Sequence, residues 1–140
     1  MKLITRDTDY AIRALGCMAQ DRDRIVTVSE LAADLDMPQS FLRKILQKLN
    51  KSGILMSCKG KGGGFLLNRP ASKISVFDVI QVFQGDFKLN EHIFQGKICP
   101  RIRACYLKQR LDMIEMSVSK QLRDMTIKNI TDKENKKGVK

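Results

Sequence analysis

A glycine-rich run, Gly60-Lys61-Gly62-Gly63-Gly64, constrains the fold of this chain more than any other feature. Short apolar segments flank the run at residues 54–59 and 65–67. Glycine adopts positive φ angles without the steric cost that other residues incur, so such a run is typical of the tip of a β-hairpin. We therefore expect two short antiparallel strands joined by a glycine-rich tip.

Three segments with helical periodicity precede this hairpin, and one follows it. Apolar residues recur at helical spacing from residue 7 to 19, and a second segment, 28–35, contains Ser29 in a position to cap a helix. A turn over residues 36–40 leads to a third segment, 40–49, which is apolar on one face. Two helices joined by a short turn are typical of a helix-turn-helix, and the hairpin would be its wing.

The predicted fold class is therefore mainly α with a small β wing, a winged helix-turn-helix over residues 1–85 that ends with a helix over 74–83. Residues 86–105 have weak periodicity and hold cysteines, which predicts a cysteine-bearing loop. From 106 to 130, apolar residues keep a three-and-four spacing over about five turns, too long and one-sided for a small domain, so we expect a dimerisation helix. Residues 131–140 are polar and predict a frayed tail. The predicted homodimer contacts are Leu107, Leu111, Ile114, Val118 and Leu122.

Charge indicates the partner of the helix-turn-helix. The chain has 26 Lys and Arg against 15 Asp and Glu, a net charge of +11, and residues 37–77 contain no acidic side chain. A solvated lysine face is the ordinary alternative, but such faces usually carry Glu and Asp among the lysines. Lys and Arg that hold phosphates, with polar residues at the start of the second helix reaching base edges, predict a double-stranded DNA partner. The candidates for DNA contact are Gln39, Ser40, Arg43, Lys44 and Lys48 on the helix, and Lys59 and Lys61 on the wing.

Other classes of function fit the sequence less well. An enzyme is not expected, because the chain has one histidine, no serine elbow and no nucleotide fingerprint. The few aromatic residues lie mainly at core spacing, which argues against the stacking platform of a single-stranded or RNA-binding protein. No apolar stretch approaches the roughly 18 residues of a membrane span and the N-terminus lacks a signal-peptide pattern, so a cytoplasmic location is expected. In such a reducing compartment the cysteines are expected to be thiols or metal ligands.

Several motifs, taken in order, resemble the Rrf2 family of regulators. The resemblance covers about residues 1–130, and its most specific element is a helix-turn-helix followed at once by a Gly-x-Gly-Gly-Gly-aromatic wing. It implies a homodimeric repressor or activator that binds a near-palindromic operator. The matching positions are Leu3, Thr8-Asp9-Tyr10-Ala11, Phe41-Leu42, Leu46, Leu49, Gly53, residues 60–67, Cys99 and Cys105.

The same resemblance implies that residues 86–105 are a sensor loop, whose iron–sulfur cluster senses redox state, nitric oxide or iron–sulfur status. Cluster-bearing members carry three loop cysteines; Cys99 and Cys105 match the second and third, whereas Ile93 stands where the first would be. Its neighbour His92 and Asp9, which matches a ligand position on helix one of the other subunit, complete a candidate set. Thiolates are the usual cluster ligands and histidine replaces some of them, so this set could hold a two-iron, two-sulfide cluster. Arg13 stands one turn after Asp9, where some members have a histidine.

Each of these ligand assignments has an alternative. The same DNA-binding dimer could lack a cluster and respond to thiol oxidation, a small molecule or a protein partner, as the missing cysteine suggests. Asp9 could cap the first helix, and His92 could be an ordinary surface or packed histidine. Cys17 is expected in the core. Cys58 is expected to be buried in a strand, the alternative being a thiol whose oxidation disturbs DNA contact.

Overall fold

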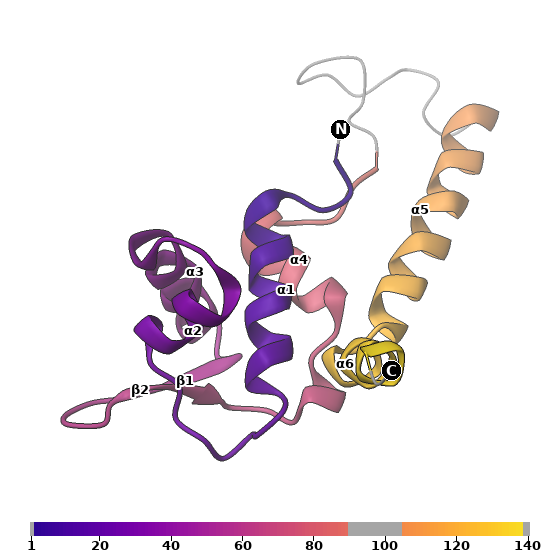
Figure 1. Ribbon diagram of the computed structural model, residues 1–140. Coiled ribbons are helices and arrows are strands. Elements are labelled where there is room, and N and C mark those ends of the chain that lie inside the picture. Colours follow the sequence, from indigo (N-terminus) through magenta and orange to yellow (C-terminus); the bar gives the residue numbers. More distant parts are fainter. Residues whose placement is uncertain (1, 90–104, 139–140) are drawn as a thin grey trace.

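The computed structural model describes residues 2–89 and 105–138, and it confirms the predicted fold class, since a mainly helical chain carries one two-stranded antiparallel sheet (Figure 1). The elements are α1 (Arg6–Met18), α2 (Val28–Leu35), α3 (Gln39–Lys51), β1 (Leu55–Cys58), β2 (Gly64–Leu67), the 3-10 helix η1 (Ala71–Lys73), α4 (Val76–Gln84), α5 (Tyr106–Asp124) and α6 (Ile127–Gly138).

Side-chain caps fix where the helices begin. Thr27 caps α2, because its hydroxyl accepts the N–H of Glu30 at 3.2 Å while the Glu30 carboxylate accepts the N–H of Thr27. The prediction that Ser29 caps this helix is therefore wrong; Ser29 lies inside the first turn. Thr5 caps α1, so the alternative that Asp9 caps this helix is also wrong.

One apolar core joins the first four helices and the wing. Helix α1 runs through the middle of the molecule and contacts α2, α3, α4, α6 and β2 (Figure 1). Its buried face carries the small residues Ala11 and Ala14, which allow close approach, followed by the large Leu15 and Met18. The largest fully buried side chains include Leu15, Leu31, Leu42, Leu46, Leu49, Ile54, Leu55, Ile74 and Ile127.

The wing is an antiparallel hairpin that is fastened to the body at its base. Leu55 pairs with Leu67 and Cys58 with Gly64, and Phe65 exchanges both backbone hydrogen bonds with Val26 at 2.8 and 2.9 Å. Gly60 and Gly62 have φ angles of +97° and +76°, as the predicted tip requires. A side chain at Gly64 would lie 2.4 Å from the carbonyl oxygen of Val26, so close backbone approach also requires a glycine there.

The C-terminal part differs from the predicted single helix over 106–130 and frayed tail over 131–140. Helix α5 ends at Asp124, and a second helix, α6, continues to Gly138 and packs on α1 and η1. The break arises because the backbone between the helices pairs with the segment before α4: Val76 N–H donates to Met125 C=O at 2.8 Å, and Ile127 N–H donates to Ile74 C=O at 2.9 Å. Thr126 then supplies the hydroxyl that accepts the Asn129 N–H in the first turn of α6.

Candidate nucleic-acid interface

Helix α3 divides into a buried face and an exposed polar face. Leu42, Ile45, Leu46 and Leu49 are buried. The predicted DNA-contact residues of this helix all lie exposed, and with Gln47 and Lys51 they form a face that carries no carboxylate. These predicted residues are Gln39, Ser40, Arg43, Lys44 and Lys48. Because the buried face is fixed in the core, the exposed face is held rigidly toward solvent.

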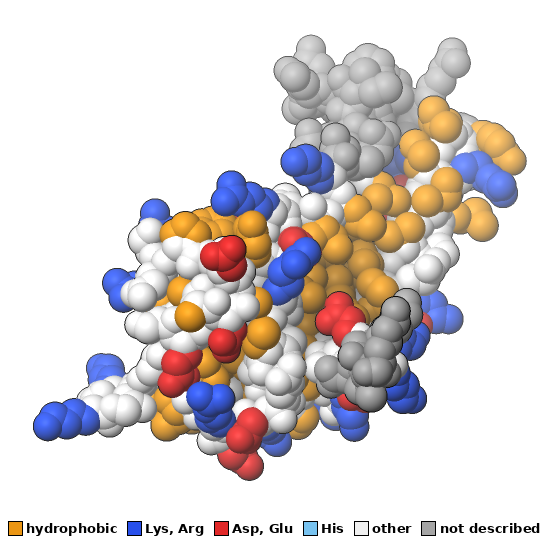
Figure 2. All heavy atoms as spheres, viewed as in Figure 1, with side chains coloured by type: hydrophobic (Ala, Val, Ile, Leu, Met, Phe, Trp, Pro, Cys, Tyr) orange, Lys and Arg blue, Asp and Glu red, His pale blue; other side chains and the backbone are white. Residues whose placement is uncertain are grey.

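The wing presents the second group of predicted contacts. Lys59 and Lys61 are exposed at the tip between β1 and β2. The wing projects from the body beyond α3, and basic side chains mark its end at the left of Figure 2. Helix α3 and the wing therefore form two separate basic elements on one rigid body, which is suited to contact with adjacent parts of a polyanion.

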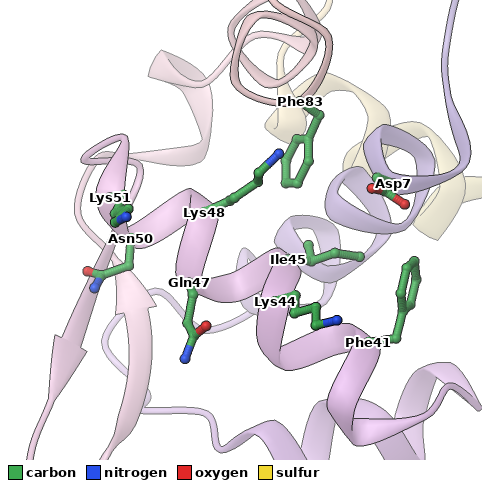
Figure 3. A pocket seen from close by; sticks show the side chains of 9 residues that line it. All are labelled: Asp7, Phe41, Lys44, Ile45, Gln47, Lys48, Asn50, Lys51 and Phe83. Carbon is green, nitrogen blue, oxygen red and sulfur yellow. The ribbon is translucent and has the colours of Figure 1, made fainter.

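One edge of α3 has an arrangement that the sequence analysis missed. The Arg6 guanidinium lies 5.1 Å from the ring centre of Phe41 and 5.6 Å from that of Tyr10, and the Lys48 ammonium lies 5.5 Å from the ring centre of Phe83. A hollow of about 580 Å³ opens beside these rings (Figure 3). Arg6 and Phe83 belong to elements outside the helix-turn-helix, so the motif gave no signal for them.

The start of α1 is tied to the end of α4 by the side chain of Gln84. Its Oε1 accepts the Thr5 N–H at 3.0 Å and the Thr8 hydroxyl at 2.8 Å, and its Nε2 donates to the Leu3 carbonyl at 3.3 Å. These bonds hold Arg6 beside the C-terminal end of α4, which leads into the predicted sensor loop. The Gln84 side chain thus links the start of α1, which lies beside α3, to the entrance of the predicted sensor loop.

Only part of the candidate cluster set lies among the described residues. Cys105 is half-buried at the N-cap of α5, where its sulfur accepts the Lys108 N–H at 3.5 Å. The Asp9 carboxylate is exposed and pairs with Arg13 at 3.1 Å. His92 and Cys99 lie outside the described residues, as does Ile93. Within residues 2–89 and 105–138, no three His, Cys, Asp or Glu side chains are placed to hold a metal ion.

The other two cysteines are both half-buried. Cys17 is half-buried and packs on the core, as expected, and burial raises the pKa of its thiol, with the Asp34 and Glu134 carboxylates acting in the same direction. Cys58 is half-buried at the end of β1, where it pairs with Gly64, and is less buried than predicted.

Helix α5 leaves apolar side chains uncovered, in contrast to the helices of the core. Leu107 is 63% exposed and Ile114 52% exposed, whereas Leu122 is 3% exposed because it packs against Val76, Phe77 and Ile80 of its own chain. The predicted contact stripe is therefore divided, with Leu111 and Val118 half-buried and Leu122 taken up within the chain. Beside the C-terminal end of α5 lies a groove of about 470 Å³ whose lining is mixed, with Ile4, Ile12, Met125 and Ile130 next to Asp9, Arg13 and Glu134.

Comparison with known proteins identifies the family. The sequence profile of the Rrf2 family, described as an iron-dependent transcriptional regulator, matches residues 4–133. The chain belongs to the Rrf2 family. The predicted resemblance is thereby confirmed, and this Rrf2 protein is a transcriptional regulator of the DNA-binding kind, as its winged helix indicates. In the described part of the chain, no helix has the length and apolar character needed to cross a membrane.

Curated relatives and solved structures agree with this assignment. The Rrf2 chain is 36% identical over 109 residues to protein aau3 of Rhizobium meliloti, covering 77% of this chain and 71% of that protein. It is 30% identical over 129 residues to a protein of Aquifex aeolicus named as an HTH-type transcriptional regulator, covering 91% and 90%.

Two solved structures share the fold at low identity. Those of CymR, the global cysteine regulator of B. subtilis, and of T. potens IscR each give a TM-score of 0.76, at 17% and 20% identity. The match to CymR covers 94% of this chain and 98% of CymR, and the match to IscR covers 100% and 93%.

Proposed function

We propose that this protein acts in the cytoplasm as a homodimer that recognises a specific, near-palindromic DNA operator with α3 in the major groove. The observation that carries the proposal is the exposed face of α3, which is rigidly held, basic and free of carboxylates. The major groove is wide enough, about 12 Å, to admit one helix, and N-terminal residues of a recognition helix reach the base edges there.

Side chains along α3 and the wing then have different roles. Arg43 is exposed near the N-terminal end of α3 and can donate two hydrogen bonds to guanine, while Gln39 and Ser40 precede it in the first turn. Lys59 and Lys61 at the wing tip supply charge to the minor groove or its phosphates. In this arrangement Arg43 contributes to sequence preference, and the wing lysines contribute affinity on any sequence.

The dimer is supported by the uncovered side chains of α5. A helix that leaves Leu107 and Ile114 more than half exposed is unusual in a chain whose other helices bury their apolar faces. The groove beside Met125 begins at the C-cap of this helix, and its apolar side chains offer a surface for the α5 helix of a second copy. Leu122, although predicted as a contact, is left out of the proposed interface because α4 of the same chain covers it.

The signal would enter through the segment between α4 and α5. Cys105 fits a cluster ligand, because its sulfur accepts the backbone N–H of Lys108, and hydrogen bonds to the ligand sulfurs tune a cluster's potential. Asp9 fits less directly, since its carboxylate would have to leave Arg13. We propose Cys99 and Cys105 as ligands of an iron–sulfur cluster, with Asp9 and His92 completing the set, the cluster supplying redox and nitric-oxide sensitivity when bound.

The test of the sensor is the visible absorbance, with iron and sulfide content, of protein purified without oxygen. A cluster held as proposed gives visible absorbance and stoichiometric iron and sulfide that are lost in Cys99→Ala and Cys105→Ala. The matched control Cys17→Ala, at a half-buried position against the core, should keep both. Visible absorbance that is lost in Cys17→Ala but kept in Cys99→Ala and Cys105→Ala would contradict the assignment.

A clusterless regulator is the second candidate, and one observation favours it. The Asp9–Arg13 ion pair already satisfies the carboxylate that the cluster would need. A colourless wild type that still binds duplex DNA would therefore assign the loop to thiol oxidation, a small molecule or a protein partner. Protein that binds no duplex DNA at any salt concentration would contradict both candidates.

A further inference from the structure

The edge of α3 that faces α1 and α4 carries cations in fixed positions. Arg6 is held over Phe41 and Tyr10, and Lys48 over Phe83. In Figure 3 the Lys48 side chain extends from α3 toward the ring of Phe83 on α4. We call the set Arg6, Lys44, Lys48 and Lys51 the basic ledge.

Aromatic contacts are a means of placing these charges in advance. A free lysine or arginine at a surface samples many rotamers, and ordering it on binding costs about 0.5–1.5 kcal/mol. A cation already held within about 6 Å of a ring centre has lost part of that freedom before the ligand arrives. Neither Arg6 nor Lys48 has a carboxylate partner among the ion pairs of the described residues, so both charges are available.

The hollow beside the ledge is basic, although not uniformly so. Its lining includes Lys44, Lys48 and Lys51 from α3, against a single carboxylate, Asp7, from α1 (Figure 3). Its volume of about 580 Å³ lies in the range of small-ligand sites, about 300–1,000 Å³. The chemistry of the lining thus selects an anion with hydrogen-bond acceptors, that is, a phosphate group.

We propose that the basic ledge binds phosphates of the DNA backbone beside the major groove, so that the DNA interface extends beyond the helix-turn-helix to the start of α1. This inference rests on the proposed DNA-binding function. An α-helix about 10–12 Å across nearly fills a groove about 12 Å wide, so the two edges of α3 face the sugar–phosphate walls. Lys48 lies about 140° around the helix from Arg43, with Gln47 and Lys44 between them, so Lys48 lies at the edge of the exposed face that is farther from Arg43.

Two side chains act indirectly in this arrangement. Phe83 is a positioning residue, since it touches Lys48 and carries no charge of its own. Asp7 opposes phosphate, because its carboxylate lines the same hollow. The ledge therefore predicts effects of opposite sign from two neighbouring residues: removal of the Arg6 charge weakens binding, and removal of the Asp7 charge strengthens it.

The test is the salt dependence of binding by the full-length protein to its selected operator and to a random duplex. Each phosphate contact contributes about 0.9 to the slope of log K against log salt concentration. Arg6→Gln and Lys48→Gln should each reduce the slope by about 0.9 on both duplexes, and Asp7→Asn should raise affinity on both. Phe83→Leu should weaken binding less than Lys48→Gln. Lys128→Gln, which removes the same charge from α6, is the control and should leave the slope unchanged.

Thermal unfolding of each variant shows whether it is folded as the wild type, and a second probe separates backbone phosphate from a free anion. Saturable binding of inorganic phosphate that is lost in Lys48→Gln, with unchanged slopes on DNA, would assign the hollow to a free anion and overturn the inference. Suppose that the salt slopes of Arg6→Gln and Lys48→Gln are unchanged while Arg43→Ala alters sequence preference. That result would overturn the basic-ledge inference and leave the proposed function intact. Absence of wild-type binding to any duplex would overturn the proposed function as well.

Discussion

The helices of residues 2–89 and helix α5 treat their apolar side chains in opposite ways. Helix α3 buries its three inward leucines and one isoleucine within its own chain. Helix α5 buries one, Leu122, and leaves Leu107 63% and Met116 73% exposed. A monomeric soluble domain seldom leaves such a row uncovered. The first region covers its apolar side chains, with help from Ile127 of α6, and presents polar ones, whereas α5 presents apolar surface, which the proposed dimer would cover.

The contrast also separates the places where exposed polar and exposed apolar residues lie. On α3 the polar residues lie outside a buried apolar face, so basic side chains can gather there without disturbing the core. On α5 the exposed surface itself carries apolar residues. The break at Met125 lets the chain return to the body, so that α6 packs on α1 while α5 contacts α4 through Leu122 (Figure 1).

The largest effect is expected where α5 is deprived of its partner. Replacing Leu107 and Ile114 together by glutamate should give a monomer and weaken operator binding by about 10² or more, because two linked half-site contacts become independent. Analytical ultracentrifugation and duplex binding measure this. Gln109→Glu, which adds a carboxylate to α5 two residues from Leu107 and so on a different face, should remain dimeric. A double variant that stays dimeric would contradict the proposed α5 interface.

The next effect distinguishes a core side chain from an interface side chain. Leu46→Ala should lower the free energy of unfolding by about 2–5 kcal/mol, because it leaves a cavity in the body. The loss should be present at every protein concentration. Leu107→Ala should instead lower the melting temperature most in dilute protein, since mass action links dimer and fold. Thermal unfolding over a hundredfold range of protein concentration measures this difference. The same concentration dependence of the melting temperature in both variants would contradict the contrast.

Exposed side chains of the body should affect binding with little effect on stability. Arg43→Ala should cost about 1–3 kcal/mol on the operator and relax sequence preference, because a guanine contact is lost. Lys61→Ala should weaken binding on every sequence and reduce the salt slope by about one. Competition binding against operators changed at single positions measures both. Equal losses for Arg43→Ala on operator and random DNA would contradict its role in base recognition.

The smallest effect concerns Cys17. Because burial raises the pKa of this thiol, less of it is thiolate near neutral pH than in a free cysteine, and the thiolate is the reactive form. Alkylation of Cys17, followed by peptide mass spectrometry, should be slower than that of N-acetylcysteine. The difference should shrink as the pH rises through and beyond the ordinary thiol pKa. Alkylation of Cys17 as fast as that of the free thiol would contradict its burial against the core.

Much of the body could be predicted from local sequence, because its signals are local. Helical periodicity located α1, α3 and α4, and glycines located the hairpin tip, where Gly60 and Gly62 adopt positive φ. The bounds predicted for α2 are confirmed, but its cap was misplaced by two residues, since Thr27 and Ser29 are both good caps. The capping box with Glu30, three residues after Thr27, decides between them.

The C-terminal region could not be predicted in the same way, because distant contacts decide it. The apolar spacing continues through Met125, and only the hydrogen bonds from Val76 and to Ile74 end the helix there. Helix α6 is polar overall and is held through few apolar residues, chiefly Ile127. Likewise, Leu122 and Ile114 are alike in sequence, and only the position of α4 separates a core residue from an exposed one. The pairing of Arg6 with Phe41 joins two separate helices and left no local motif.

The central claim, recognition of DNA by α3 in a dimer, is tested most directly by selecting bound duplexes from a random pool with the full-length protein. We predict enrichment of a near-palindrome whose two half-sites are separated by about one helical turn, roughly 10 base pairs, or a multiple of it. Arg43→Ala should enrich a different half-site. Recovery of no common sequence, or of a single unrepeated half-site bound equally well by the Leu107 and Ile114 double variant, would contradict the account.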